Sequence, residues 1–297
     1  MNRTFLVIGY GSLLSGYGLL AERRGGRSRL EAHDIHPAAL SNARRGLAKP
    51  SSHGDYLAMD LEPIDPALPI AAHAGPARKN EIGVLLLEFD RKWARAVARR
   101  EEYDPDRFEH LIALADRAGK TLGEFLLAIA QDTQFSLAAY RGALRAVCGY
   151  TSPGYIFHPV PLDDGRVAVV AIGSGYDSSG DATVVSRRRE LGMDRLLTLA
   201  EALSHERLSV HREGQIGYFA ECMLGGMHGI DVADLLIGLD MRAQLASELA
   251  SRIAMVAARE REHFLSAGAL DHGRYRTRFS GTPIAALRAL LKLAGVG

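Results

Sequence analysis

The chain has 297 residues, of which 47% are hydrophobic, so it is long enough for one large or two ordinary globular domains and too apolar to be disordered throughout. Its 36 Lys and Arg nearly balance its 35 Asp and Glu, which gives no net field to attract nucleic acid or an anionic membrane and favours a small-molecule partner. The two cysteines lack the paired spacing of a zinc or redox site, which is typical of a reducing compartment. With no signal-peptide core and no apolar run near the length of a membrane span, we expect a cytoplasmic protein.

Short apolar runs near the N terminus predict β-strands. They cover Thr4–Ile8, Tyr56–Met59 and Ile82–Phe89, and Gly, Pro and Ser interrupt the chain between them. Between the last two runs, Ala67–Lys79 is rich in Ala, Pro and Gly and has no period. We interpret that segment as a loop that could cover a pocket.

A helical pattern begins at Arg91, where apolar residues share one side and Arg or Lys the other. It ends before Tyr103, because a proline follows two residues later and disfavours helix in the residue that precedes it. Two adjacent carboxylates, Glu101 and Glu102, are therefore placed at a helix end.

Helical patterns also fill residues 108–150, which we expect to form two or three helices as an insertion. Thr121 and Glu124 match a capping box that would begin one of them. Residues 191–297 are predicted to be a helical C-terminal extension. Its apolar stripe along Met241–Leu265 is more typical of a core or homodimer contact than of a cofactor site.

Strand character returns between these helical parts, at Tyr155–Phe157 and Val167–Ile172. The run Asp163-Asp164-Gly165 between them is a good hairpin turn, because glycine readily takes a positive φ. We therefore expect the sheet to resume here and to complete a first unit over residues 1–190.

The strongest motif follows the first strand, where residues 9–18 read Gly-Tyr-Gly-Ser-Leu-Leu-Ser-Gly-Tyr-Gly. Such a turn exposes consecutive backbone N–H groups that can bind an anion or a developing oxyanion. A dinucleotide fingerprint would need Gly in place of Leu14, and a phosphate-binding P-loop would need Lys in place of Tyr17. Both are excluded, which leaves either a substrate loop or a tight packing turn.

The run Tyr10-Gly11-Ser12-Leu13, directly after a strand, resembles the signature loop of the gamma-glutamylcyclotransferases. Later segments follow the order of that family over about the first 110 residues: Pro37–Gly46, Tyr56–Pro63, Ile82–Leu85 and Arg100-Glu101. Residues 168–180 are similar to the late Gly-Ser segment of its ChaC-like branch.

The resemblance implies an α+β protein with a small, mixed or antiparallel, β-barrel-like sheet, to which this chain adds the helical insertion and the helical C-terminal part. It also implies a small gamma-glutamyl compound as substrate, bound by Tyr10, Gly11, Ser12, Leu13 and Tyr103, with no metal and no organic cofactor.

In that family a Glu at a helix end, commonly Arg-Glu before a Tyr, is the catalytic base, and Arg100-Glu101 with Tyr103 is the matching place. Family members usually have further residues between the Glu and the Tyr, so Glu102 is the alternative. The base removes a proton from the α-amine of a gamma-glutamyl group, which attacks its own γ-carbonyl and forms 5-oxoproline. We expect backbone N–H groups of residues 9–13 to bind the oxyanion. Partial burial of Glu101 would raise its pKa toward that of a useful base.

Two other functions remain open at this point. The chain could catalyse a related reaction on a larger gamma-glutamyl amide, or it could keep the fold as a non-catalytic binding or regulatory protein. Arg44 and Arg45 could hold a substrate carboxylate or face water. His158 could line a pocket mouth or lie satisfied in the core or at the surface.

Overall fold

The structure is a computed structural model of the whole chain. It describes the following residues: 4–11, 13, 32, 34–50, 57–101, 103–149, 155–173, 196–198, 201, 215, 218, 248 and 251. Most of the predicted C-terminal extension, including nearly all of its Met241–Leu265 stripe, lies outside them, as do both residues at the predicted boundary between 190 and 191.

The main sheet has six strands in the order β5-β2-β6-β1-β8-β7. Their bounds are β1 (Thr4–Gly9), β2 (Asp34–Ser41), β5 (Ala71–Ala74), β6 (Ile82–Asp90), β7 (Tyr155–Pro161) and β8 (Val167–Gly173). Strand β1 pairs antiparallel with β6 and parallel with β8, so it is central. The sheet curls until edge strand β5 meets the residue that follows β7, at a bridge between Ala72 and Leu162. The predicted α+β class with a mixed, curled sheet is therefore confirmed.

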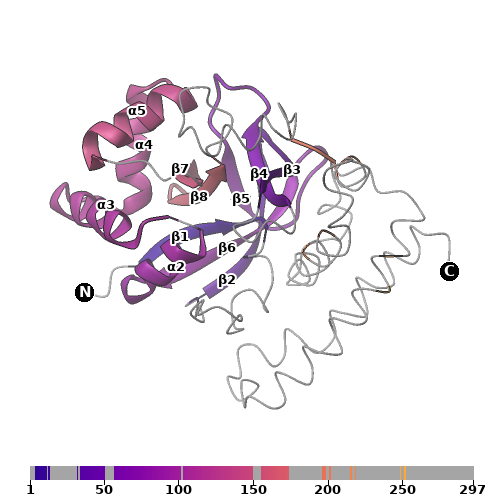
Figure 1. Cartoon of the computed structure of the whole chain (residues 1–297), viewed down its shortest axis with the longest axis horizontal. Coiled ribbons are helices and arrows are strands. Elements are labelled where there is room, and N and C mark those ends of the chain that lie inside the picture. Colours follow the sequence, from indigo (N-terminus) through magenta and orange to yellow (C-terminus); the bar gives the residue numbers. More distant parts are fainter. Residues whose placement is uncertain are drawn as a thin grey trace, which may run out of the picture.

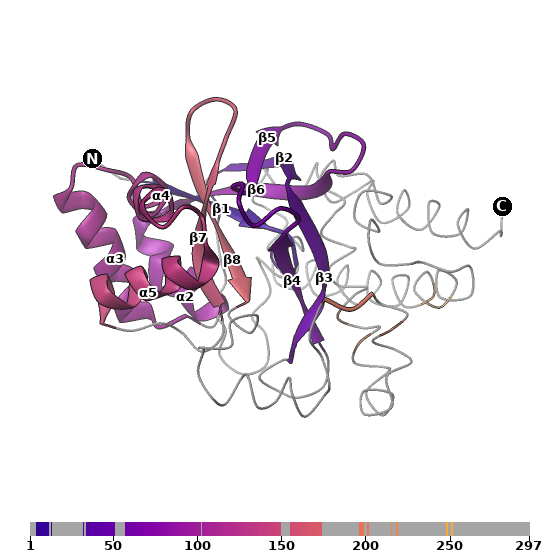
Figure 2. The ribbon, with the colours of Figure 1, turned by 90° about the horizontal axis from the view of Figure 1, so that it is seen from above.

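A second, two-stranded antiparallel sheet contains β3 (Ala43–Pro50) and β4 (Leu57–Pro63). Its register is irregular between Leu47 and Lys49. Figure 2 shows this pair as a long ribbon that crosses beside the main sheet. Its outer edge on β3 forms a bridge with Leu197, which comes much later in the chain.

Helices cover the other side of the main sheet (Figure 1). They are the 3-10 helix η2 (Arg91–Trp93), α2 (Ala94–Arg100), α3 (Pro105–Arg117), α4 (Leu122–Asp132) and α5 (Leu137–Cys148). The expected capping box of α4 is present, with Thr121 and Glu124 bonded reciprocally. The predicted helical insertion thus consists of three helices.

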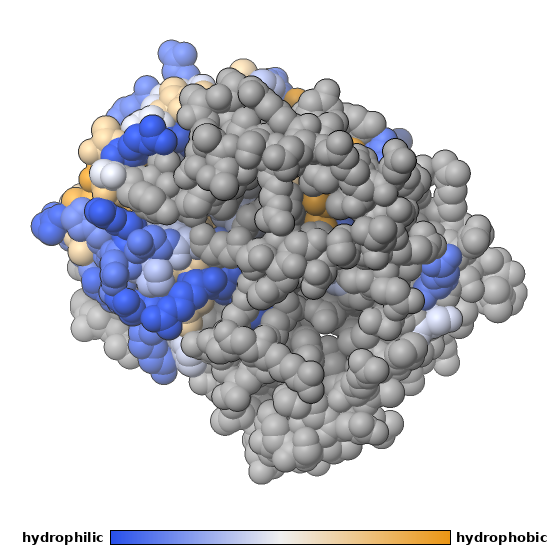
Figure 3. All heavy atoms as spheres, in the orientation of Figure 1, coloured by the Kyte–Doolittle hydropathy of each residue, from blue (hydrophilic) through white to orange (hydrophobic). Residues whose placement is uncertain are grey.

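Aromatic rings join these helices to the sheet. Phe108 of α3 lies against Phe157 of β7, with ring centroids 4.5 Å apart. On the outer side, the Arg95 guanidinium of α2 pairs with Asp106 at 2.6 Å and with Glu109 of α3 at 2.7 Å. Hydrophilic side chains accordingly cover that face in Figure 3. Within the described residues, no helix is long and apolar enough to cross a membrane.

The predicted loop Ala67–Lys79 is partly wrong, because β5 lies inside it. Strand β5 is short and rich in alanine, so it shows no pattern of large apolar side chains. It is a strand because its backbone pairs with β2. The predicted strands at Thr4–Ile8, Tyr56–Met59 and Ile82–Phe89 are confirmed as β1, β4 and β6, with shifted ends.

Candidate functional site

Tyr10 directly follows β1, and its side chain is buried. Its hydroxyl donates a hydrogen bond of 2.5 Å to the carbonyl of Ala171 on β8. Because β1 and β8 run parallel, the turn after β1 and the end of β8 lie at the same edge of the sheet. Burial raises the pKa of Tyr10 well above its ordinary value, and the charges of Asp60 and Glu101 raise this pKa further. Tyr10 is therefore a neutral phenol, a donor rather than a base.

Glu101 is the C-cap residue of α2, as predicted, and is half-buried. Its N–H donates to the carbonyl of Val97 at 3.0 Å. The chain then turns, and the N–H of Tyr103 donates to the carbonyl of Ala98 at 2.8 Å. After burial and Asp60, the charge of Glu101 is the next contribution to the raised pKa of Tyr10, so the helix-end carboxylate lies within electrostatic range of the turn after β1. Glu102, the alternative base, is outside the described residues.

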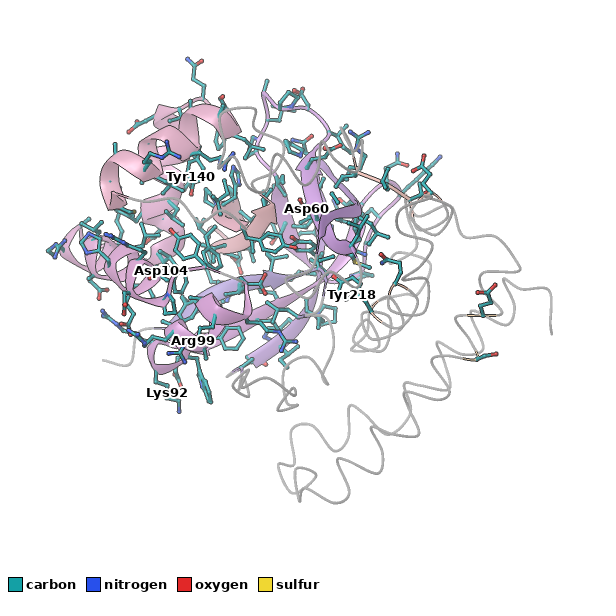
Figure 4. All side chains as sticks on the ribbon, in the orientation of Figure 1. Asp60, Lys92, Arg99, Asp104, Tyr140 and Tyr218 are labelled. Carbon is teal, nitrogen blue, oxygen red and sulfur yellow. The ribbon has the colours of Figure 1, made fainter. Side chains whose placement is uncertain are left out.

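Asp60 of β4 is a fully buried carboxylate that sequence reasoning missed. One of its oxygens, Oδ1, accepts from the N–H of Leu61 at 2.8 Å and from the N–H of Gly173 at 2.6 Å. A Cβ at Gly173 would lie 1.8 Å from the other oxygen, so the end of β8 needs glycine there. Figure 4 places Asp60 among the strand ribbons. Nothing in the local sequence distinguishes this aspartate from a surface residue of β4.

Two further tyrosines reach the same place, and both were also missed. The hydroxyl of Tyr155 donates to the carbonyl of Met59 at 2.9 Å, and the hydroxyl oxygen of Tyr218 accepts from the N–H of Met59 at 2.9 Å. Tyr218 adds to the rise in the pKa of Tyr10, whereas a side-chain hydrogen bond between Tyr10 and Tyr155 opposes it. Three phenols and the carboxylate of Asp60 thus gather where β1, β4 and β8 end or pass, and the charge of Glu101 at the end of α2 reaches Tyr10 among them.

The glycines of the turn are held by close packing. A Cβ at Gly9 would lie 3.0 Å from the Cβ of Leu13, and a Cβ at Gly11 would lie 3.2 Å from the hydroxyl oxygen of Tyr218. Leu13 is buried. Ser12 is outside the described residues, so the predicted oxyanion donors of this turn stay a prediction.

Tyr103 packs among aromatic side chains of the helical side. Its ring is buried against Phe108 and Phe157, with centroids 6.1 and 5.3 Å away. Its predicted role in substrate binding therefore rests on the resemblance alone.

The two arginines of β3 differ. Arg44 is exposed and forms an ion pair with Glu62 across the β3–β4 ribbon. Arg45 is buried and donates to the carbonyl of Gly83 on β6 at 2.6 Å, which ties the ribbon to the main sheet. His158 is also buried, so of its two predicted places the core is the one it takes, and burial lowers its pKa to about 4.

Among the described residues, no group of three or more His, Cys, Asp or Glu side chains could hold a metal ion. No protein-family model, no curated protein and no solved structure matches this chain. The function of this chain is therefore inferred from the geometry of the cluster and from the motif after β1.

Proposed function

We propose that this protein is a gamma-glutamylcyclotransferase-like enzyme that releases 5-oxoproline from a gamma-glutamyl amine or peptide. One observation carries the proposal: the hydrogen bond from Tyr10 to Ala171 fixes the turn after β1, and the charge of Glu101, about 90 residues further along the chain, reaches the hydroxyl that makes this bond. The proposed reaction needs backbone N–H groups for the oxyanion and a carboxylate base for the α-amine, so the turn and the carboxylate must lie near the same substrate.

In the proposed reaction the α-ammonium of the substrate first loses a proton to Glu101. Its nitrogen then attacks the γ-carbonyl carbon, and the new C–N bond closes the five-membered ring. The bond to the leaving amine breaks as that amine takes the first proton back from Glu101. The ring nitrogen then gives its second proton to the freed carboxylate, which passes it to the departing amine, so the amine leaves as its ammonium form and no other reactant is needed. Attack within one molecule requires chiefly that the substrate be held in a bent conformation.

The surroundings of Glu101 suit this role. The residue is half-buried at the end of α2, so part of the solvent is excluded from its carboxylate. Tyr10 stays protonated because of its burial, and its bond to Ala171 fixes the turn beside the carboxylate. Asp60 accepts a hydrogen bond from Gly173 and so fixes the end of β8, which carries the carbonyl of Ala171 that Tyr10 binds.

The test is release of 5-oxoproline from glutathione and from a panel of gamma-glutamyl amino acids and amines. We expect Glu101→Gln to lower kcat/KM by roughly 10²–10⁴, the usual contribution of general base catalysis. Glu102→Gln tests the alternative base. Glu109→Gln is the matched control, because it removes a half-exposed carboxylate that pairs with Arg95 on the outer side of α3.

Loss of activity in Glu102→Gln alone would move the base by one residue. Turnover unaffected by both substitutions would refute the mechanism. No release from any compound would refute the cyclotransferase assignment for small substrates, and calorimetric binding of a gamma-glutamyl compound without turnover would favour a non-catalytic binding protein. Release only from longer gamma-glutamyl peptides would favour the related enzyme with a larger substrate.

A further inference from the structure

The outer edge of β4 is bound by side chains that come much later in the chain, two of them after the last strand of the main sheet. An edge strand presents backbone groups that need partners. At Leu57 the side chain of Gln215 supplies both a hydrogen-bond acceptor and a donor. Its Oε1 accepts from the N–H of Leu57 at 2.8 Å, and its Nε2 donates to the carbonyl of Leu57 at 3.1 Å. A carboxamide here replaces a neighbouring strand. At Met59, two residues along the same edge, the hydroxyls of Tyr218 and Tyr155 take the N–H and the carbonyl.

The outer edge of β3 is covered from the same part of the chain. Leu47 and Leu197 exchange two backbone hydrogen bonds, of 2.8 and 2.9 Å. Gly46 lies so close to Leu196 that a Cβ there would be 2.5 Å from the Cβ of that leucine. Residues after 195 therefore hold the β3–β4 ribbon by both edges.

Tyr218 links this arrangement to the candidate site. Gln215 and Tyr218 are both helical and three residues apart, so they lie on one side of a helix. Tyr218 is buried and approaches Asp60 from the side opposite helices α3–α5 (Figure 4). Its hydroxyl oxygen touches the N–H of Met59 on β4 and lies 3.2 Å from the position of a Cβ on Gly11.

We propose that Tyr218 is a positioning residue for the turn at Tyr10 and Gly11, and that its hydroxyl, fixed on Met59, sets how closely this turn approaches β4. The C-terminal part of the chain would then determine the geometry of the site that the N-terminal part supplies. The catalytic consequence rests on the proposed function, whereas the structural consequence does not.

The proposal explains why residue 11 is glycine. The glycines with positive φ among the described residues are Gly75, Gly119, Gly149 and Gly165, so the backbone at Gly11 does not itself require glycine. What limits the side chain is the oxygen of Tyr218. An alanine at 11 would make a tighter contact with that oxygen than ordinary van der Waals packing allows, and removal of the oxygen would restore the space.

The test is a double-mutant cycle on the full chain with Gly11→Ala and Tyr218→Phe. We expect each single variant to lower kcat/KM per folded molecule by roughly tenfold to a hundredfold, because a small displacement of the turn misplaces the substrate. The loss should appear chiefly in kcat. The double variant should be at least several times more active than the product of the two single effects predicts, since the phenyl ring leaves room for the alanine.

Tyr140→Phe is the matched control. Tyr140 is another buried tyrosine, and its hydroxyl donates to the carbonyl of Phe157 at 2.7 Å, on the helical side. Combined with Gly11→Ala, it should give additive effects on activity and on the urea midpoint. Hydrogen exchange supplies a readout without substrate: the amide of Met59 should exchange at least about tenfold faster in Tyr218→Phe and unchanged in Tyr140→Phe.

Additive effects of Gly11→Ala and Tyr218→Phe on both the urea midpoint and activity, with unchanged exchange at Met59, would overturn the proposal. If the wild type releases no 5-oxoproline, the proposed function fails, but the stability cycle and the exchange rate still decide the role of Tyr218. Coupling in the urea midpoint with no coupling in an active enzyme would overturn the catalytic part alone.

Discussion

The two sides of the main sheet are held by different kinds of contact. On the helical side, the rings of Phe108 and Phe157 pack against each other, and α4 approaches β8 so closely that a Cβ at Gly123 would lie 2.1 Å from the carbonyl oxygen of Val167. On the β3–β4 side, side-chain oxygens bind backbone N–H groups, as at Asp60 and Tyr218. The contacts of the helical side depend on how side-chain shapes fit together, and those of the β3–β4 side depend on particular hydrogen-bonding atoms.

This difference indicates where function and stability reside. Apolar packing is non-directional, and substitutions that conserve volume are usually tolerated. A buried polar group, by contrast, is costly as soon as one partner is lost. The β3–β4 side retains several such groups beside Tyr10 and Glu101, which is the arrangement expected where chemistry rather than packing selects the residues.

The largest effect is expected where shape is tightest, at Gly123. Gly123→Ala should lower the free energy of unfolding by about 3 kcal/mol, because the carbonyl of Val167 belongs to a strand and cannot rotate away. Gly142→Ala, in α5, is the matched control: a Cβ there meets no atom within 4 Å. It should raise the free energy of unfolding by about 0.5–1 kcal/mol, since alanine is the better helix former. Urea denaturation measures both, and equal effects would contradict the close approach of α4 to β8.

His158 tests whether the helical side tolerates charge. It is buried with its ring 5.2 Å from that of Tyr140, and burial lowers its pKa to about 4 from an ordinary 6.5. The unfolded chain therefore binds a proton in a pH range where the folded protein does not. The free energy of unfolding should fall as the pH drops below 6.5 and stop falling near 4, with a total loss of about 3 kcal/mol from this group.

Urea denaturation at a series of pH values should therefore show a shallower pH dependence in His158→Gln than in the wild type. The slope is the readout, because the substitution also changes packing. His110→Gln, at an exposed position of α3, is the control variant. An unchanged slope in His158→Gln would mean that this histidine is solvated or paired before the protein unfolds.

A smaller effect is expected from Asp60→Asn on the polar side. Asparagine keeps the shape and an acceptor for the N–H groups of Leu61 and Gly173, but it removes the charge. We expect the free energy of unfolding at pH 7 to fall by about 2 kcal/mol, because hydrogen bonds to charged groups are the stronger ones. Asp132→Asn, at the exposed end of α4, should change it by less than about 0.5 kcal/mol. A neutral result at Asp60 would show that the charge is not what holds β8.

Features whose signal is local were predictable from the sequence. The capping box of Thr121 and Glu124 involves residues three apart, and the β7–β8 hairpin depends on Gly165, whose φ is +84°. The end of α2 at Glu101 follows from its helical period and the proline beyond. In each case the determining atoms lie within one turn of chain, so the residue types alone identify them.

Features that depend on distant partners were not predictable in this way. Strand β2 contains Pro37, which is unfavourable within a sheet and hides its strand character. Asp60 resembles a surface aspartate until Gly173 is placed beside it, and Tyr218 lies in a segment whose pattern indicates only a helix. Their roles follow from the three-dimensional pairing of segments more than 100 residues apart, as the sequence separations of 113 and 159 in these hydrogen bonds show.

The position of β1 between β6 and β8 has a consequence for how the protein is synthesised. The first strand finds its antiparallel partner only after Asp90 has left the ribosome, and its parallel partner only after Gly173. Such long-range pairing is slow, because a large loop must close before any contact compensates for it. The contacts of Tyr10 with Ala171 and of Gly11 with Tyr218 form only once the later residues have been synthesised. A nascent or truncated chain therefore contains the sequence motif of the site but not its three-dimensional structure.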